Sequence, residues 1–496
     1  MRLALVLGVI GKILRMYSMA FLPPLALALY NANYGNNLGD YDATISFCVA
    51  IVATLGGGFL LNRYSEKDQN FRRSEALGVV AGAWLVIAIF TAIPYVMSGM
   101  SGVDAFFESI SGLTTTGATI LSDFNQTDSF FLWRSMSQWF GGLGVIALFV
   151  VILPQLGVAG RQIMFAESSD ATTDVVSPSV RKSARNLWLL YVGLTSLEMV
   201  LLKFVGDMSA FDSICHGLTT MSAGGFSPNP NSIAGYSSPA IEWILIGFMT
   251  ISGMSFPLLY VGLRRRPLSI VRDGEFRFYI GTLLFAAAGV ALVLSHGTFD
   301  LTSVRTGLFQ SASLISSTGY ASVDYAAAPW TDSARAFLVI AMLVGGCAGS
   351  AAGGPKAIRN LLSLKYMWAE LTRTLHPRGV LPLRHRGRVI PNNAMRSILN
   401  LVICYALTYV VVALILVMLG SNFVTAFSAS LACVGNIGPG FESVGPMGNF
   451  AEIGSASKIV LSIGMWMGRL ELVTILALLH PDVIRHLHWR GKFTRN

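Results

Sequence analysis

Four short segments of small and hydroxylic residues interrupt the long apolar stretches of this chain. Each follows a semi-polar segment of helical length and precedes another apolar stretch. The segments are Thr115-Thr116-Gly117, Ser222-Ala223-Gly224, Ser317-Thr318-Gly319 and Asn436-Ile437-Gly438. Backbone that leaves a helix in apolar surroundings is tolerated only where it is buried in protein or lines a watery cavity. Carbonyl oxygens turned into such a cavity can replace the hydration shell of a cation, so the four copies predict a cation site.

The residue types at these turns suit that chemistry. Glycine fits because successive inward carbonyls require φ values that residues with a side chain resist. Thr115, Ser222, Ser317 and Asn436 can brace the turns or add oxygens. The helices before the turns would direct their partly negative C-terminal ends toward the cavity, which also favours a cation. One such segment alone could be an ordinary re-entrant loop or a packing turn, but four copies on the same side of a membrane favour the cation site.

The apolar stretches are long enough to cross a bilayer. Of the 496 residues, 53% are hydrophobic and 12% charged, and the mean hydropathy is +0.60. A hydrocarbon core about 30 Å thick requires roughly 20 apolar residues per helix. The windows that meet this requirement are 42–62, 74–98, 130–156, 186–205, 239–263, 278–295, 334–352, 397–420 and 457–479. Residues 1–30, divided by Lys12 and Arg15, are expected to form a retained span, with a cleaved signal peptide as the alternative.

The basic residues predict the orientation of the chain. Because short cytoplasmic loops retain Lys and Arg, both termini are expected to be cytoplasmic. The net charge of +9 does not indicate nucleic acid binding, since the bases flank membrane spans without interleaved aromatic residues. The loops expected on the other side of the membrane, away from the basic segments, are rich in acids such as Asp104, Glu108 and Glu442. Such an acidic outer face could concentrate cations. Most of the 35 basic residues fall in the segments 61–73, 157–186, 262–277, 355–396 and 481–496.

The order of span, short helix, turn and span occurs four times along the chain. Such a repeat predicts four pseudo-repeated units around a central pore, and therefore an all-α integral membrane protein. The expected parts are an N-terminal pair of helices at 1–68 and four pore units at 69–165, 178–266, 272–375 and 392–496. The last unit includes a cytoplasmic tail.

The second span of the third unit contains a glycine-rich stretch, residues 344–359. Each glycine costs a helix about 1 kcal/mol relative to alanine, so this span is expected to open into a loop. The spacing fits no phosphate-binding motif, whereas close helix packing through small residues is a real alternative. The residues expected to form an intramembrane gate are Gly345, Gly346, Gly349, Ser350, Gly353 and Gly354.

Arg469 is the one basic residue that this topology leaves deep inside the membrane. An intramembrane charge is costly and usually faces a cavity or a partner. Facing the pore, Arg469 would form a barrier to cations and could hold the glycine loop through its carbonyls. A salt bridge to another span is the alternative, although not with Glu471, which lies on a different helix face. The chain contains no recognisable hydrolase or metalloprotease motif, so an enzyme is not expected.

The four turns resemble those of a known family. T-T-T-G-A-T in the first, A-G-G-F-S in the second, S-T-G-Y in the third and N-I-G-P-G-F in the fourth are similar to the Trk/Ktr/HKT superfamily of cation transporters. The likeness is greatest to TrkH-type potassium uptake subunits, and it covers nearly the whole chain, including two extra N-terminal spans. It implies a potassium filter at the four turns, a glycine-loop gate and a homodimer docked on a ring of cytosolic nucleotide-binding subunits. Glycine in all four turns looks like the potassium-preferring version, but one glycine per turn implies imperfect discrimination against sodium.

The expected function is channel-like potassium uptake across a bacterial inner membrane. Potassium would be the transported ion, and no covalent cofactor is expected. A potential of about 100 mV is worth roughly 2.3 kcal/mol per charge, so inward flux needs no pump chemistry. Two alternatives stay open: a sodium- or proton-coupled symporter of the same superfamily, and an unrelated inverted-repeat solute transporter. The second alternative predicts two related halves, whereas this sequence has four turns on one side.

Overall fold

The chain folds into a helical membrane protein. Among the residues that the structure describes, six helices are long and apolar enough to cross a bilayer, and a bent pair makes a possible seventh span. The expected all-α membrane fold is therefore confirmed, with one two-stranded hairpin in the described part of the chain. The computed structural model describes residues 1–34, 38–64, 72–147, 180–264, 267–295, 300–327, 330–377 and 381–485. Parts of the predicted segments 61–73, 130–156, 157–186 and 481–496 lie outside these ranges.

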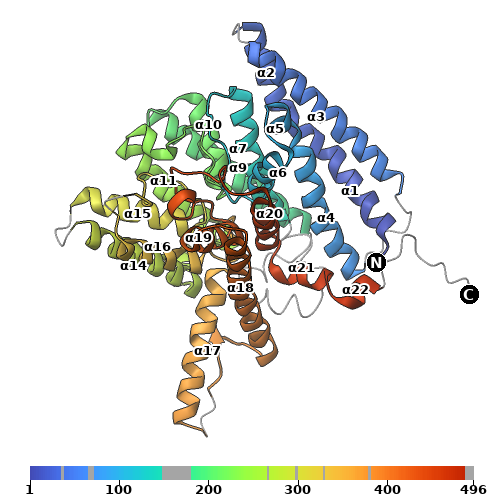
Figure 1. The fold of residues 1–496 in the computed structure, drawn as a ribbon. Helices are drawn as coiled ribbons and strands as arrows, with labels where there is room; N and C mark the ends of the chain where they lie inside the picture. Colours follow the sequence, from blue (N-terminus) through green and yellow to red (C-terminus); the bar gives the residue numbers. More distant parts are fainter. Residues whose placement is uncertain are drawn as a thin grey trace, which may run out of the picture.

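The third helix packs against both the first and the second at one edge of the molecule (Figure 1). Their apolar residues are only partly buried, which suits helices that face lipid. The N-terminal elements are α1 (Leu3–Tyr17), η1 (Ser18–Phe21), α2 (Leu22–Tyr34) and α3 (Leu38–Asn62). The next elements are α4 (Arg73–Thr91), α5 (Ile93–Met97), α6 (Gly102–Leu113) and α7 (Asp128–Ala147).

The remaining elements follow the expected order of long helix, short helix and second helix. After α7 come α9 (Val180–Phe204), α10 (Ala210–Met221), η4 (Ser232–Tyr236), α11 (Pro239–Ser252), α12 (Phe256–Arg264) and α13 (Leu268–Arg272). Next are α14 (Gly274–Leu294), α15 (Leu301–Ile315), α16 (Asp332–Val344), α17 (Ala357–Leu375), β1 (Arg384–His385) and β2 (Arg388–Val389). The last are α18 (Asn392–Met418), α19 (Phe423–Val434), η5 (Glu442–Val444), α20 (Ser455–Arg469), α21 (Leu472–Leu478) and α22 (Pro481–Arg485).

Four short helices, α6, α10, α15 and α19, form the centre of the molecule. With 12 to 15 residues each, they are about 18 to 22 Å long and too short to cross a hydrocarbon core. Each begins at a polar N-cap whose side chain accepts a backbone N–H of the first turn. The caps are Ser101, Ser209, Asp300 and Asn422. The C-terminal halves of the helices are buried nearly all round, so these helices are held inside the protein.

The second helix of each unit packs against the short helix of the next unit. The contacting pairs are α7 with α10, α11 with α15, α16 with α19, and α20 with α6. Because the last pair joins the fourth unit to the first, the four units form a closed ring. Helix α17 and the adjoining end of α18 project from this ring (Figure 1).

Two windows predicted as single spans are broken. The window 239–263 divides into α11 and α12, which meet at an angle of 103°. The window 457–479 divides into α20 and α21, with Glu471 at a φ of 61° between them. The break after Val344 agrees with the sequence prediction, because residues 345–356 form an irregular loop between α16 and α17.

Candidate functional site: a ring of four glycine turns

All four short helices end with the same backbone geometry. The second residue after each helix adopts a left-handed conformation, with φ between 51° and 56° at Thr115, Ala223, Ser317 and Asn436. The N–H of the residue that follows bonds to a carbonyl five residues back, as in Thr116 N to Ser111 O at 2.9 Å. This is the Schellman motif, which satisfies the free carbonyls of a helix end and turns the chain sharply. The equivalent bonds are Gly224 to Thr219, Thr318 to Ser313 and Ile437 to Ala432, each at 2.8 Å.

A glycine with positive φ follows each left-handed residue by two positions. Its φ is 82° at Gly117, 78° at Gly225, 83° at Gly319 and 104° at Gly438. A Cβ added at these glycines would lie 2.2, 1.8, 2.1 and 2.7 Å, respectively, from a backbone oxygen of another unit. The oxygens, in the same order, are those of Gly224, Thr318, Ile437 and Thr116. Each turn therefore contacts the next around a complete circle, and no side chain fits at the four glycines.

The sequence comparison of the four turns placed the turn of the second unit one residue out of register with the other three. Ser222 is the C-cap of α10, in the right-handed helical region, and it matches Thr114 and Ser316 rather than Thr115 and Ser317. The structural equivalents of Thr115-Thr116-Gly117 are therefore Ala223, Gly224 and Gly225. The error arose because two glycines are adjacent in A-G-G-F-S, and the first was taken as the turn. Only the backbone conformation identifies the second as the matching position.

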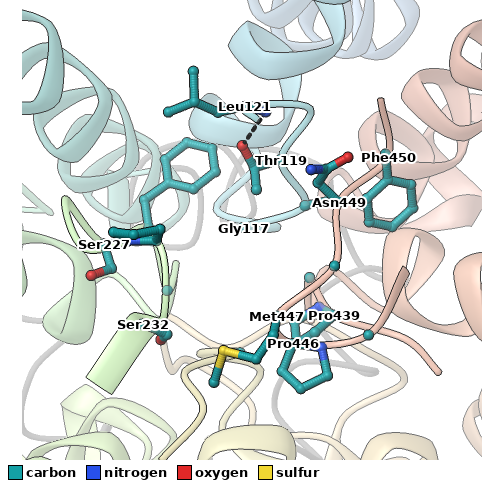
Figure 2. Close-up of a pocket in the computed structure, with 18 of the residues that line it drawn as sticks. Gly117, Thr119, Leu121, Ser227, Ser232, Pro439, Pro446, Met447, Asn449 and Phe450 are labelled. Atoms are coloured by element: carbon teal, nitrogen blue, oxygen red, sulfur yellow. Dashed lines mark hydrogen bonds between the residues drawn. The ribbon is translucent and has the colours of Figure 1, made fainter. Parts of the chain in front are cut away.

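The four ring glycines line one cavity of about 180 Å³. Figure 2 shows Ser227 and Ser232 of the second unit on one side, with Asn449 and Phe450 of the fourth on the opposite side. Thr119 of the first unit faces the cavity, and its hydroxyl accepts the N–H of Leu121 at 3.0 Å. The cavity is therefore lined by backbone and small polar groups together with larger side chains such as Arg134, Met447 and Phe450.

The predicted side-chain oxygens have different environments. The Ser317 hydroxyl accepts the N–H of Gly353 at 2.6 Å, and Asn436 donates from Nδ2 to the Thr116 hydroxyl and to the carbonyl of Met465, both at 2.9 Å. Thr115 Oγ1 and Asn436 Oδ1 are buried, with no hydrogen-bond partner in the described part of the chain. The Ser222 hydroxyl donates back into its own helix, to the carbonyls of Leu218 and Thr219.

The glycine loop, residues 345–356, lies directly against the ring. A Cβ at Gly353 would come within 2.4 Å of the carbonyl of Gly435, the C-cap of α19. On its other side the loop bonds to the broken end of α11, where Cys347 N donates to Gly253 O at 2.8 Å and Ala351 N to Ser252 O at 3.2 Å. The loop thus satisfies carbonyls that the break in α11 leaves free.

The environment of Arg469 supports one of its two predicted roles. The side chain is buried at the end of α20, and Nη1 donates to the carbonyl of Ala351 in the glycine loop at 2.8 Å. Nη2 lies 3.4 Å from the carbonyl of Gly141. The alternative, a salt bridge to another span, is not seen among the described residues. Glu471 pairs instead with Arg359 of α17 at 2.8 Å.

The loops predicted to lie on the outer side contain five basic residues, and most of these are paired with acids. Four of their five basic residues form ion pairs, and the fifth, Lys203, donates to the carbonyl of Met208. Acids in these pairs are less able to attract cations than free carboxylates would be. The pairs are Arg134–Glu108 at 2.7 Å, Lys458–Asp104 at 2.6 Å, Arg305–Glu242 at 2.8 Å and Arg335–Asp332 at 3.0 Å.

Comparison with known proteins gives consistent matches. Residues 43–482 match a family model described as "TrkH: Cation transport protein". The chain is 34% identical to the "Trk system potassium uptake protein TrkH" of Salmonella typhimurium, covering 96% of this chain and 98% of that protein. It is 30% identical to the "Trk system potassium uptake protein TrkG" of Escherichia coli strain K12, covering 94% and 96%.

A solved structure shows that the similarity extends to the fold. The crystal structure of the potassium transporter TrkH from Vibrio parahaemolyticus matches with a TM-score of 0.86 at 30% sequence identity. The match covers 97% of this chain and 100% of that chain. Sequence and fold are therefore similar over nearly the full length.

Proposed function

Because this chain belongs to the TrkH family of cation transport proteins, we propose that it takes up potassium through the ring of glycine turns. The named relatives are potassium uptake proteins, and the family is one of transporters rather than enzymes. The proposed filter consists of Thr115 to Gly117, Ala223 to Gly225, Ser317 to Gly319 and Asn436 to Gly438. Residues 223–225 replace the segment 222–224 that the sequence alignment suggested.

The closed circle of glycine-to-carbonyl contacts carries this proposal. Gly117, Gly225, Gly319 and Gly438 each pack against a backbone oxygen of the next unit, and all four line the same cavity. A dehydrated cation requires several oxygens at one place, which a ring of backbone turns supplies without any carboxylate. The unpartnered oxygens of Thr115 and Asn436 support it further, because a buried oxygen without a partner costs about 1–3 kcal/mol. A passing cation would provide that partner.

We also propose that the glycine loop is the gate below this filter. The loop contacts the filter through Ser317 and Gly353 and is held by Arg469 through Ala351. The buried guanidinium would additionally repel a cation that reaches the loop. Opening therefore requires the loop to give up hydrogen bonds to the filter, to α11 and to Arg469. Of the gate residues proposed from the sequence, Gly345, Gly346, Gly349, Ser350, Gly353 and Gly354 belong to this loop, and Arg469 contacts it from the end of α20.

Potassium entry would be driven by the membrane potential. An inside-negative potential of about 100 mV supports roughly 50-fold accumulation of a monovalent cation. The proposed location is a bacterial inner membrane with both termini in the cytoplasm. The proposed assembly remains a homodimer with cytosolic nucleotide-binding subunits, docked where basic loops and the projecting helix α17 reach the cytoplasm.

The direct test is rubidium and sodium uptake by the purified protein in liposomes, with sodium and membrane potential varied separately. Wild-type protein is expected to take up rubidium in preference to sodium, at a rate that rises with the inside-negative potential. Gly117→Ser should lower this preference about tenfold, equivalent to about 1.4 kcal/mol, because its Cβ displaces the Gly224 carbonyl.

The matched control is Gly193→Ser, because a Cβ at Gly193 on α9 meets no atom within 4 Å. An unchanged rubidium-to-sodium ratio in folded Gly117→Ser protein would remove this turn from the filter. Stimulation of rubidium uptake by external sodium would favour the symporter instead.

A further inference from the structure

Gln138 connects the first unit to the filter strand of the second. Its side chain extends from α7 and is fully buried. Nε2 donates to the carbonyl of Gly224 at 2.7 Å, and Oε1 accepts the N–H of Phe226 at 3.0 Å. The two bonds lie on either side of Gly225, so a single amide holds the turn at the ring.

The Gly224 carbonyl differs in this respect from its three equivalents. The carbonyls of Thr116, Thr318 and Ile437 occupy the matching positions, each against the glycine of a neighbouring unit. Within the described ranges, none of these three accepts a hydrogen bond. One of the four oxygens of the ring is therefore engaged by a protein donor, and the ring is not fourfold in its chemistry.

The residues that match Gln138 in the other units explain the difference. Gly142 and Gly253 both pack against a tyrosine hydroxyl and a serine C-cap of the next short helix. Gly141 and Gly468 both pack against the carbonyl of the last residue of their own short helix. With the Gly345-Gly346 pair aligned to Gly141-Gly142, the counterparts of Gln138 are Met249, Met342 and Met465. All three methionines are buried, and methionine has no hydrogen to donate.

We propose that Gln138 is a positioning residue that sets the discrimination between potassium and sodium, given the filter proposed above. A carbonyl that already accepts an N–H offers a weaker field to a cation and moves less freely. Both the field strength of the coordinating dipoles and the size of the site govern selection between the two ions. A stronger field and a more mobile strand both favour the smaller sodium ion. The amide of Gln138 therefore opposes sodium by restraining the turn that is richest in glycine, Ala223-Gly224-Gly225.

The test is Gln138→Met, which places in the first unit the residue that the other three contain. In liposomes, its rubidium-to-sodium uptake ratio is expected to fall at least fivefold below that of wild-type protein, with rubidium uptake retained. Met249→Leu is the matched control, because it changes shape at the equivalent buried position without changing any donor. This control should keep the wild-type ratio.

Gln138→Glu separates positioning of the carbonyl from simple packing. When ionised, the carboxylate keeps the shape and can still accept the Phe226 N–H, but it has no hydrogen for the Gly224 carbonyl. Because a buried acid can instead be protonated and donate its O–H, the variant is assayed at alkaline pH. The rubidium-to-sodium uptake ratio of this variant should also fall. If Gln138 served only to fill space, the ratio would stay at the wild-type value. This near-isosteric variant also decides the matter if Gln138→Met does not assemble. An unchanged ratio in the assembled variants would overturn the proposal, while Gly117→Ser would still test the filter itself. Absence of any rubidium preference in wild-type protein would instead reject the filter.

Discussion

At the residue scale, Arg469 combines the two effects that the sequence predicted for a pore-facing arginine, a hold on the glycine loop and a positive charge. The guanidinium hydrogen-bonds to the carbonyl of Ala351, which ties α20 to the glycine loop. It also places a buried positive charge beside that loop, where a cation would be repelled. Lysine would retain the charge but not the planar fork that reaches both Ala351 and Gly141.

Substitution of Arg469 tests whether its charge and its hydrogen bond to Ala351 together restrain the loop. Arg469→Met should raise rubidium flux through the isolated protein about tenfold, because both the charge and a hydrogen bond worth about 1.5–3 kcal/mol are removed. Arg469→Lys should stay near the wild-type flux, since the single strong bond and the charge can both be kept. Rubidium efflux from liposomes measures this, with Arg373→Met on the exposed side of α17 as the control.

Two results would contradict this account. Unchanged flux in Arg469→Met would show that the residue is no part of the gate. Flux in Arg469→Lys as high as in Arg469→Met would show that the fork, and not the charge, restrains the loop.

Residue types alone predicted most of the ring, and the exceptions have physical causes. Gly117, Gly319 and Gly438 could be identified because none of them has a second glycine directly beside it. In the second turn, Gly224 and Gly225 are chemically identical candidates, and only φ separates them. Gln138 could not be found, because an isolated glutamine in an apolar helix gives no indication of the carbonyl that it will meet 86 residues away.

At the scale of elements, the broken helices differ in how far the sequence could reveal them. The loop after α16 follows from five glycines within ten residues. The break between α11 and α12 has a weaker signal, with Gly253 and Pro257 four residues apart, and it was missed. The break at Glu471 has one glycine nearby, Gly468, but the residue at the break is itself neither glycine nor proline. There the backbone adopts a positive φ at a glutamate that pairs with Arg359, a contact 112 residues away.

The hairpin of β1 and β2 is a second element whose position depends on tertiary contacts. Its turn residues Arg386 and Gly387 both have positive φ. Arg386 forms an ion pair with Asp273, whose carboxylate also caps the N-terminus of α14. His385 is buried beside this contact. Burial, together with the positive charge of the neighbouring Arg386, lowers the pKa of His385 from 6.5 to about 4.

Docking of this hairpin should therefore depend on pH. Because the pKa is depressed in the docked state, the undocked histidine binds more protons, and docking is fully stable only above about pH 6.5. Its stability should fall as the pH is lowered from about 6.5 toward 4, by at most about 3 kcal/mol. Hydrogen exchange of residues 384–389 in the whole protein measures the change.

The comparison variant for the hairpin is His385→Gln, which does not titrate in this range. Protection of the hairpin in this variant should be nearly constant between pH 7 and 5. Equal loss of protection in wild-type and His385→Gln protein would show that another group controls docking.

At the scale of the whole molecule, the four units are joined at two levels. The upper level is the ring, in which each short helix meets the second helix of the preceding unit and each glycine meets a carbonyl of the next. The lower level is the ion pair between Arg359 of α17 and Glu471, which precedes α21. This pair joins the third and fourth units directly beneath the glycine loop. Movement of α17 would therefore act on the loop from below while the ring above it stays closed.

A double-mutant cycle can measure how strongly the Arg359–Glu471 pair couples the third unit to the fourth. Arg359 is 2% exposed and Glu471 26% exposed, so their pair is screened less than a surface pair. We expect Arg359→Met and Glu471→Gln to show a coupling energy of about 1–3 kcal/mol in the free energy of unfolding in mixed detergent micelles. The Arg373–Glu370 pair on exposed α17, at 39% and 43% exposure, should show less than about 1 kcal/mol. Equal coupling in the two pairs would mean that the inner contact does not hold the third and fourth units together.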